Sequence, residues 1–152
     1  MREHGFTLVE LIITIAIMGI VLLVAFPSVS RIQQQNKYEK LVSYGQSMVA
    51  SGKLYVDQYQ EDLWGNMNAT GSRVISINTL KNANLMKEIN DKKTVCSTGS
   101  LKVSRTGSRN QFNYTYQYTL SCRVSGKTVT CEGDANTSKC KQDGRIIYNT
   151  ET

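Results

Sequence analysis

The hydrophobic residues of this chain are concentrated in one block near the N-terminus. From Phe6 to Phe26 the sequence is dominated by Leu, Ile, Val, Ala, Met and Gly, with Glu10 as its one ionisable residue. A helix over these about 20 residues is about 30 Å long, which is enough to cross a bilayer. No small-residue cleavage site of the secretory type follows the block. We therefore expect residues 6–28 to form a membrane helix that stays attached to the rest of the chain.

A second helical pattern follows Pro27. Apolar residues and glycines recur in steps of three and four, and lysine, glutamine and aspartate occupy the opposite face. We expect an amphipathic half-helix over residues 29–62 that lies against a sheet, where two glycines of the stripe permit close approach. Pro27 lacks a donor N–H, so with Gly19 it marks the segment most able to bend. The stripe consists of Tyr38, Leu41, Gly45, Met48, Gly52, Tyr55 and Tyr59, beside Val42, Val49 and Val56.

The remaining residues, 63–152, predict a small head. Gly, Asn, Ser and Thr indicate a loop from Trp64 to Ser72, and a short helix is expected within 75–89, capped by Ser76 or Asn78. Period-two alternation predicts strands over 101–105, 112–122 and 128–131, joined as an antiparallel meander with a tight turn at Ser125-Gly126. Residues 132–144 are expected to form a loop, and 145–148 a fourth strand. The fold class is α+β.

All four cysteines lie in the C-terminal part of the chain, at Cys96, Cys122, Cys131 and Cys140. Zinc sites usually show tight Cys-x-x-Cys pairs, often with histidines, whereas His4 is the only histidine here. An even number of widely spaced cysteines favours two disulfides formed in an oxidising compartment. Four cysteines allow three pairings, between which the sequence does not choose. We prefer Cys96–Cys122 with Cys131–Cys140, because it would join two strands and close a short loop.

The chain is basic, with a formal net charge of +6, and residues from Tyr59 onward carry 13 Lys and Arg against 8 Asp and Glu. Basic residues interleaved with aromatics are typical of nucleic-acid binding, so DNA is a candidate partner. We favour the alternative that Tyr114, Tyr116 and Tyr118 face the helix while the cations are solvated. The candidate cations are Lys92, Lys93, Lys102, Arg105, Arg109, Arg123 and Lys127.

The N-terminal residues Gly5-Phe6-Thr7-Leu8-Val9-Glu10, followed by the apolar run with Gly19 and Pro27, resemble the signature of type IV pilins and pseudopilins. The resemblance covers about the first 30 residues. It implies that a membrane peptidase cuts the Gly5–Phe6 bond and methylates the new N-terminus, so that residues 1–5 are a leader. It also implies assembly roles for Phe6, Glu10, Gly19 and Pro27, and a pilin-like fold in which a long N-terminal helix packs on a small antiparallel sheet.

A carboxylate within an apolar helix requires a physical reason. A charged side chain at the bilayer centre costs about 2.5 kcal/mol or more even on lenient scales. In the family that the signature resembles, Glu10 of one subunit would neutralise the Phe6 amine of a neighbour, which offsets two desolvation penalties and selects one axial register. The alternative is that Glu10 lies among the cytoplasmic headgroups and is solvated.

The resemblance implies a structural subunit of a type IV pilus, serving adhesion, motility or DNA uptake. Its partners would be other pilin subunits, the prepilin peptidase and methyltransferase, and the inner-membrane assembly platform and motor. It would first span the bacterial cell membrane once, with a cytoplasmic N-terminus, and then enter an extracellular pilus. The alternatives are a pseudopilin of a type II secretion or competence system, and a single-span surface protein that never polymerises.

No catalytic constellation is present in the sequence. Removal of the leader removes His4, which excludes histidine-based triads and histidine metal sites, and no nucleophile elbow, phosphate loop or dinucleotide fingerprint occurs. We expect no enzyme, no cofactor and no metal. Glu132, Asp134, Asn136 and Asp143 offer oxygen donors for calcium, but without the regular spacing of a calcium loop.

Overall fold

The computed structural model describes residues 7–65, 69–89, 92–108 and 111–150, and only the backbone of residues 23–28 and Ser108. The chain forms two compact units, Met1–Lys37 and Tyr38–Thr152, and each is described by itself. The elements in chain order are α1 (Leu8–Gln58), α2 (Gln60–Trp64), β1 (Gly71–Ser76), α3 (Ile77–Asn82), β2 (Thr94–Ser108), β3 (Gln111–Val124), β4 (Lys127–Gly133), β5 (Ser138–Gln142) and β6 (Arg145–Asn149).

The first unit contains the N-terminal part of α1. The helix is continuous from Leu8 to Gln58 and passes through Gly19 and Pro27, so the bend expected there stays a prediction. The described apolar side chains of this unit, from Leu8 to Leu22 and at Val29 and Ile32, are exposed. Within the described part of the chain, we find no helix that combines the length and apolar character needed to cross a bilayer. The predicted span of 6–28 includes Phe6 and the side chains of residues 23–28, which lie outside the described residues.

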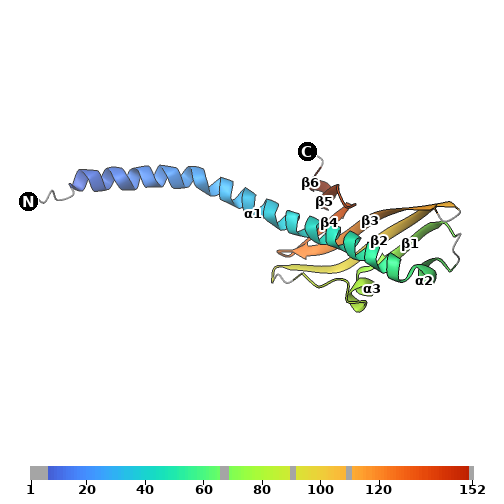
Figure 1. The fold of residues 1–152 in the computed structure, drawn as a ribbon. Coiled ribbons are helices and arrows are strands. Elements are labelled where there is room, and N and C mark those ends of the chain that lie inside the picture. Colours follow the sequence, from blue (N-terminus) through green and yellow to red (C-terminus); the bar gives the residue numbers. More distant parts are fainter. Residues whose placement is uncertain (1–6, 66–68, 90–91, 109–110, 151–152) are drawn as a thin grey trace, which may run out of the picture. The chain divides into compact units, whose positions relative to one another are not determined.

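The second unit is built on a six-stranded antiparallel sheet in which every strand pairs with the next along the chain, in the order β1 to β6 (Figure 1). The predicted meander is confirmed as parts of β2, β3 and β4, and the predicted fourth strand is β6. Two strands were predicted wrongly. The residues of β1 were expected to belong to a loop and a helix, and those of β5 to a loop. Each buries little apolar surface: Ile75 in β1, and Ser138 with Cys140 in β5.

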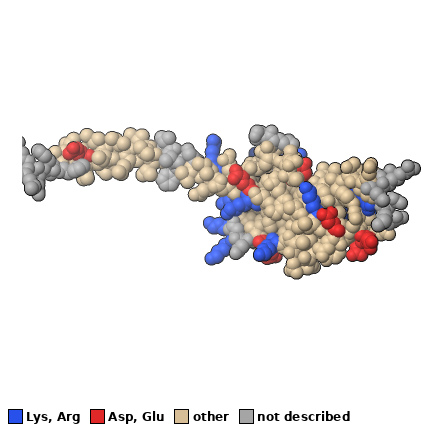
Figure 2. All heavy atoms as spheres, in the orientation of Figure 1, with Lys and Arg blue, Asp and Glu red and all other residues tan. Residues whose placement is uncertain are grey.

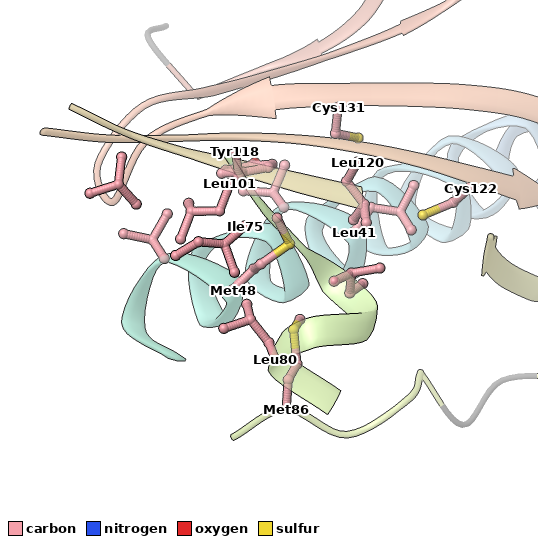
Figure 3. Packing of buried hydrophobic residues seen from close by; sticks show 14 of the residues in the cluster. Leu41, Met48, Ile75, Leu80, Met86, Leu101, Tyr118, Leu120, Cys122 and Cys131 are labelled. Carbon is pink, nitrogen blue, oxygen red and sulfur yellow. The ribbon is translucent and has the colours of Figure 1, made fainter. Parts of the chain in front are cut away.

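The C-terminal part of α1 packs on one face of this sheet, as its apolar stripe predicted. Its buried residues Leu41, Met48 and Val56 join core residues of the strands, and Figure 3 shows Leu41 beside Leu120 and Cys122. This long amphipathic helix on an antiparallel sheet confirms the α+β, pilin-like fold class.

Two glycines set the distance between α1 and the sheet. A Cβ atom built on Gly45 would overlap the ring of Tyr118, and one built on Gly52 would overlap Leu101. Both sheet residues are fully buried, so neither has open space into which to move. The prediction that these glycines permit close approach is therefore confirmed.

Helix α3 closes the core on the side of α1. Its predicted cap is Ser76, whose Oγ accepts a hydrogen bond from the Thr79 backbone N–H at 3.1 Å. The segment that follows α3 is bound to α1 by two side chains. The Ser51 hydroxyl donates to the Leu85 carbonyl at 2.7 Å, and the Tyr44 hydroxyl donates to the Lys87 carbonyl at 2.8 Å.

Two disulfides join neighbouring strands, Cys96 to Cys122 and Cys131 to Cys140. This is the pairing that we preferred from the sequence. In each bridge the two cysteines are direct partners in the strand register, between β2 and β3 and between β4 and β5. The bridges therefore fix the register of β2 against β3 and of β4 against β5.

Candidate processing and assembly site

The start of α1 is defined by a capping box between Thr7 and Glu10. The Thr7 hydroxyl accepts a hydrogen bond from the Glu10 backbone N–H at 3.3 Å. In return, a Glu10 carboxylate oxygen accepts from the Thr7 backbone N–H at 3.3 Å and from the Thr7 hydroxyl at 3.1 Å. This reciprocal pattern satisfies two donors that the first turn of a helix leaves without partners.

The capping box places the helix boundary close to the predicted cleavage point. Because Thr7 is the cap and Leu8 the first helical residue, Gly5 and Phe6 precede α1 in the chain. Gly5 and Phe6 themselves lie outside the described residues, so the cleavage and methylation assigned to them stay predictions. Thr7 is a residue that our reading of the sequence missed, although the pattern Thr-x-x-Glu before an apolar run signals such a cap.

The carboxylate of Glu10 is exposed in the single chain, and its described partners all belong to Thr7. A Glu at the third helical position also interacts favourably with the partial positive charge of the helix N-terminus. Gly19 lies farther along the same exposed helix, and a Cβ built on it would meet nothing within 4 Å. The assembly roles of Glu10, Gly19 and Pro27 remain predictions, because they concern contacts with other subunits.

Comparison with known families gives a match at this same N-terminal segment. Residues 1–26 match the family described as the prokaryotic N-terminal methylation motif. This motif supports a type IV pilin-family prepilin. No curated protein and no solved structure matches the chain. The motif indicates a membrane-anchored precursor that is processed by a prepilin peptidase and then assembles into a pilus-type filament.

The basic and aromatic residues of the head do not form one surface. Tyr118 is buried against Gly45 of α1, and the Tyr114 hydroxyl accepts a hydrogen bond from Gln60 at 2.5 Å. Arg105 is also buried, with its guanidinium 3.6 Å from the centre of the Phe112 ring. The tyrosines therefore face the helix, as we favoured from the sequence, and DNA binding stays a prediction.

The acidic residues considered for calcium have partners within the chain. Asp134 accepts the backbone N–H groups of Thr137 and Asn136, both at 2.8 Å, and these bonds lower the pKa of its carboxyl. Glu132 accepts from Lys141 at 2.8 Å, which lowers the pKa of that carboxyl. In the described part of the chain, no three His, Cys, Asp or Glu side chains come together in a metal-binding group.

Proposed function

We propose that this prepilin is a structural subunit of a type IV pilus, serving adhesion, motility or DNA uptake, and that it has no catalytic activity. The observation that carries the proposal is the position of Glu10 within the methylation motif, at the start of a helix whose apolar side chains are exposed. An exposed apolar helix of this kind requires lipid or other apolar helices around it.

The subunit would change its surroundings once. Residues 6–28 would anchor the precursor in the bacterial cell membrane with the N-terminus in the cytoplasm, and residues 63–152 would lie outside with their disulfides. After removal of residues 1–5, the assembly platform and motor would transfer the helix from lipid to a bundle of identical helices. Both environments shield the same apolar surface, so the transfer has a small free-energy cost.

The Glu10 carboxylate would then exchange partners. In the precursor its hydrogen bonds are made with Thr7 of the same chain. In the filament it would meet the methylated amine of Phe6 from an adjacent subunit, where a charge without a partner is unfavourable in an apolar bundle. Only one axial register brings the two groups together, so this pair would select the register of the filament.

Two measurements on the native protein test this function. Mass spectrometry of the mature chain is expected to find methylated Phe6 at the N-terminus and no residues 1–5. Immunogold microscopy of cells is expected to find the protein along extended fibres. An intact Met1 would contradict processing, and a processed chain that stays in the envelope would favour the pseudopilin alternative over a pilus subunit.

A further inference from the structure

The second unit, which contains the head and the C-terminal part of α1, begins at Tyr38. The start of this part of α1 marks one end of the unit. The direction of β3 identifies this end: Gln60 of α2 donates to the Tyr114 hydroxyl near the start of β3, while Leu41 lies beside Cys122 near the end of β3 (Figure 3). The end of β3, the turn that follows it and the starts of β2 and β4 therefore gather where α1 enters. We call this part of the molecule the entry end.

The entry end carries an open basic groove. The groove has a volume of about 450 Å³ and is lined by Lys92, Lys93, Val95, Arg123, Ser125 and Gly126. Val95 and Arg123 are direct partners in the register of β2 and β3, and both are exposed; Val95 has 63% of its surface accessible. Figure 2 shows Lys and Arg side chains gathered at this end of the head.

Positive charge predominates at the entry end. Its cations are Lys40, Lys92, Lys93, Arg123 and Lys127. In the sequence, Glu39 adjoins Lys40 and Asp91 adjoins Lys92, and these seven residues together carry a net charge of +3. Among the described residues, ion pairs join Lys81 to Glu88 and both Lys139 and Lys141 to Glu132. Neither Lys92 nor Arg123 takes part in these described pairs, so these two cations of the groove are suited to an external anion.

The connectivity of the chain keeps the entry end within reach of the membrane. The predicted span ends at residue 28, and Tyr38 follows ten residues later, about 15 Å along a helix. The headgroup layer covers about 5–8 Å, so a tether of this length allows the entry end to come within about 10 Å of the lipid phosphates. That separation is about one Debye length at physiological ionic strength, so attraction to an anionic bilayer acts across it.

We propose that the entry end docks on anionic phospholipid headgroups while the precursor is anchored in the bilayer. This proposal rests on the proposed function, because it needs the membrane-anchored stage. Lys92 and Arg123 would bind the lipid phosphates, and the exposed Val95 between them would contact the interface. Nucleic acid fits the groove less well, since base stacking uses aromatic side chains and no aromatic residue lines it.

The test uses the full chain in nanodiscs of phosphatidylcholine, with or without phosphatidylglycerol, that contain a lipid with a nitroxide on its headgroup. Methyl NMR then reports which side chains approach the nitroxide. We expect the Val95 methyl signals to broaden in phosphatidylglycerol nanodiscs and to recover in 1 M salt. Val74 is the internal control, because it is exposed and pairs with Lys102, seven residues or about 23 Å along β2 from Val95.

Matched charge variants test which cations act. Each cation near an anionic surface contributes about 1 kcal/mol, so Lys92→Gln with Arg123→Gln is expected to weaken docking about 30-fold. Lys53→Gln with Lys102→Gln removes the same charge from exposed positions on α1 and β2, and is expected to leave the Val95 broadening unchanged. Unchanged Val74 signals would show that both variants are folded.

Several outcomes would overturn the proposal. Equal Val95 broadening in the two lipid compositions, or equal loss in the two charge variants, would exclude a specific basic docking surface. A shift of Val95 on addition of a DNA oligonucleotide, without a response to phosphatidylglycerol, would assign the groove to nucleic acid instead. A chain that inserts but does not respond overturns only this proposal, whereas a chain that fails to insert also contradicts the proposed function.

Discussion

Replacing Gly45 with alanine tests how closely α1 packs on the sheet. The new Cβ would overlap two ring atoms of Tyr118 and lie 2.7 Å from a third, Cδ2. The ring has little room to move, because Tyr118 is buried and its hydroxyl donates to the Ser138 hydroxyl at 2.8 Å. Either α1 must move away from the sheet, or the ring must shift and lose that hydrogen bond.

The cost follows from three contributions. Overpacking of a core costs roughly 1–3 kcal/mol, and the lost hydrogen bond about 1 kcal/mol. Alanine recovers about 1 kcal/mol relative to glycine within a helix. The net loss in the free energy of unfolding is therefore about 2 kcal/mol, which lowers the melting temperature of a head of this size by roughly 6–12 °C.

Thermal unfolding of the full chain in detergent, followed by the fluorescence of the buried Trp64, measures this change. Gly19→Ala is the matched control in the same helix, since a Cβ there meets nothing within 4 Å. We expect Gly19→Ala to leave the melting temperature of the head unchanged. An unchanged or raised melting temperature for Gly45→Ala would refute the close packing of α1 on Tyr118.

Two further predictions concern the head. From separations of 26 and 9 residues, loop-closure entropy predicts that the free energy of unfolding falls by about 3.5 kcal/mol without the Cys96–Cys122 bridge and by about 2.6 kcal/mol without the Cys131–Cys140 bridge. Urea unfolding of the two double alanine variants should therefore show the larger loss for the first bridge. Burial, with smaller contributions from neighbouring charges, raises the pKa of Tyr116 from 10.0 to about 12, so the folded state holds this proton more tightly than the unfolded state does. The contribution of this group to the free energy of unfolding is complete below pH 10 and is lost as the pH rises toward 12. The free energy of unfolding of the Tyr116→Phe variant should therefore decline less steeply over this pH range.

Long periodic patterns made much of the fold predictable. The stripe that includes Leu41 and Met48 has the period of a helix over six turns, and alternation through β3 extends from Phe112 to Cys122, so in both cases one face is clearly apolar. The preferred disulfide pairing followed from the same strands, because Cys96 and Cys122 were placed on neighbours in a meander. Local sequence was sufficient where an element buries a continuous face.

Short edge elements were not predictable in the same way. β5 contains mostly polar residues and is held by Cys140 and by pairing on both sides, which are contributions from distant parts of the chain. One local signal was available: Asp143-Gly144 forms the turn into β6, with positive φ at both residues. The groove between Lys92 and Arg123 depends on the register of β2 and β3, so the sequence alone did not bring these cations together.

Thr7 shows a different reason for a missed site residue. Glu10 was considered only as a charge within an apolar block, so its role as the third residue of a capping box was overlooked. The two roles are compatible, because the cap uses the carboxylate in the single chain and the proposed amine contact needs a second subunit. They are separable by experiment, since glutamine also serves in a capping box but carries no charge.

Glu10 is proposed to support polymerisation through its charge, and the Glu10→Gln variant removes that charge while keeping the shape of the side chain. Fibres sheared from cells and counted by immunogold microscopy give the yield, mass spectrometry confirms removal of residues 1–5, and Glu39→Gln removes a carboxylate from an exposed position farther along α1 as a control. We expect Glu10→Gln to be processed but to build almost no fibres, while Glu39→Gln builds them normally. Processed Glu10→Gln subunits that form fibres at the wild-type yield would show that the charge of Glu10 is not needed for assembly.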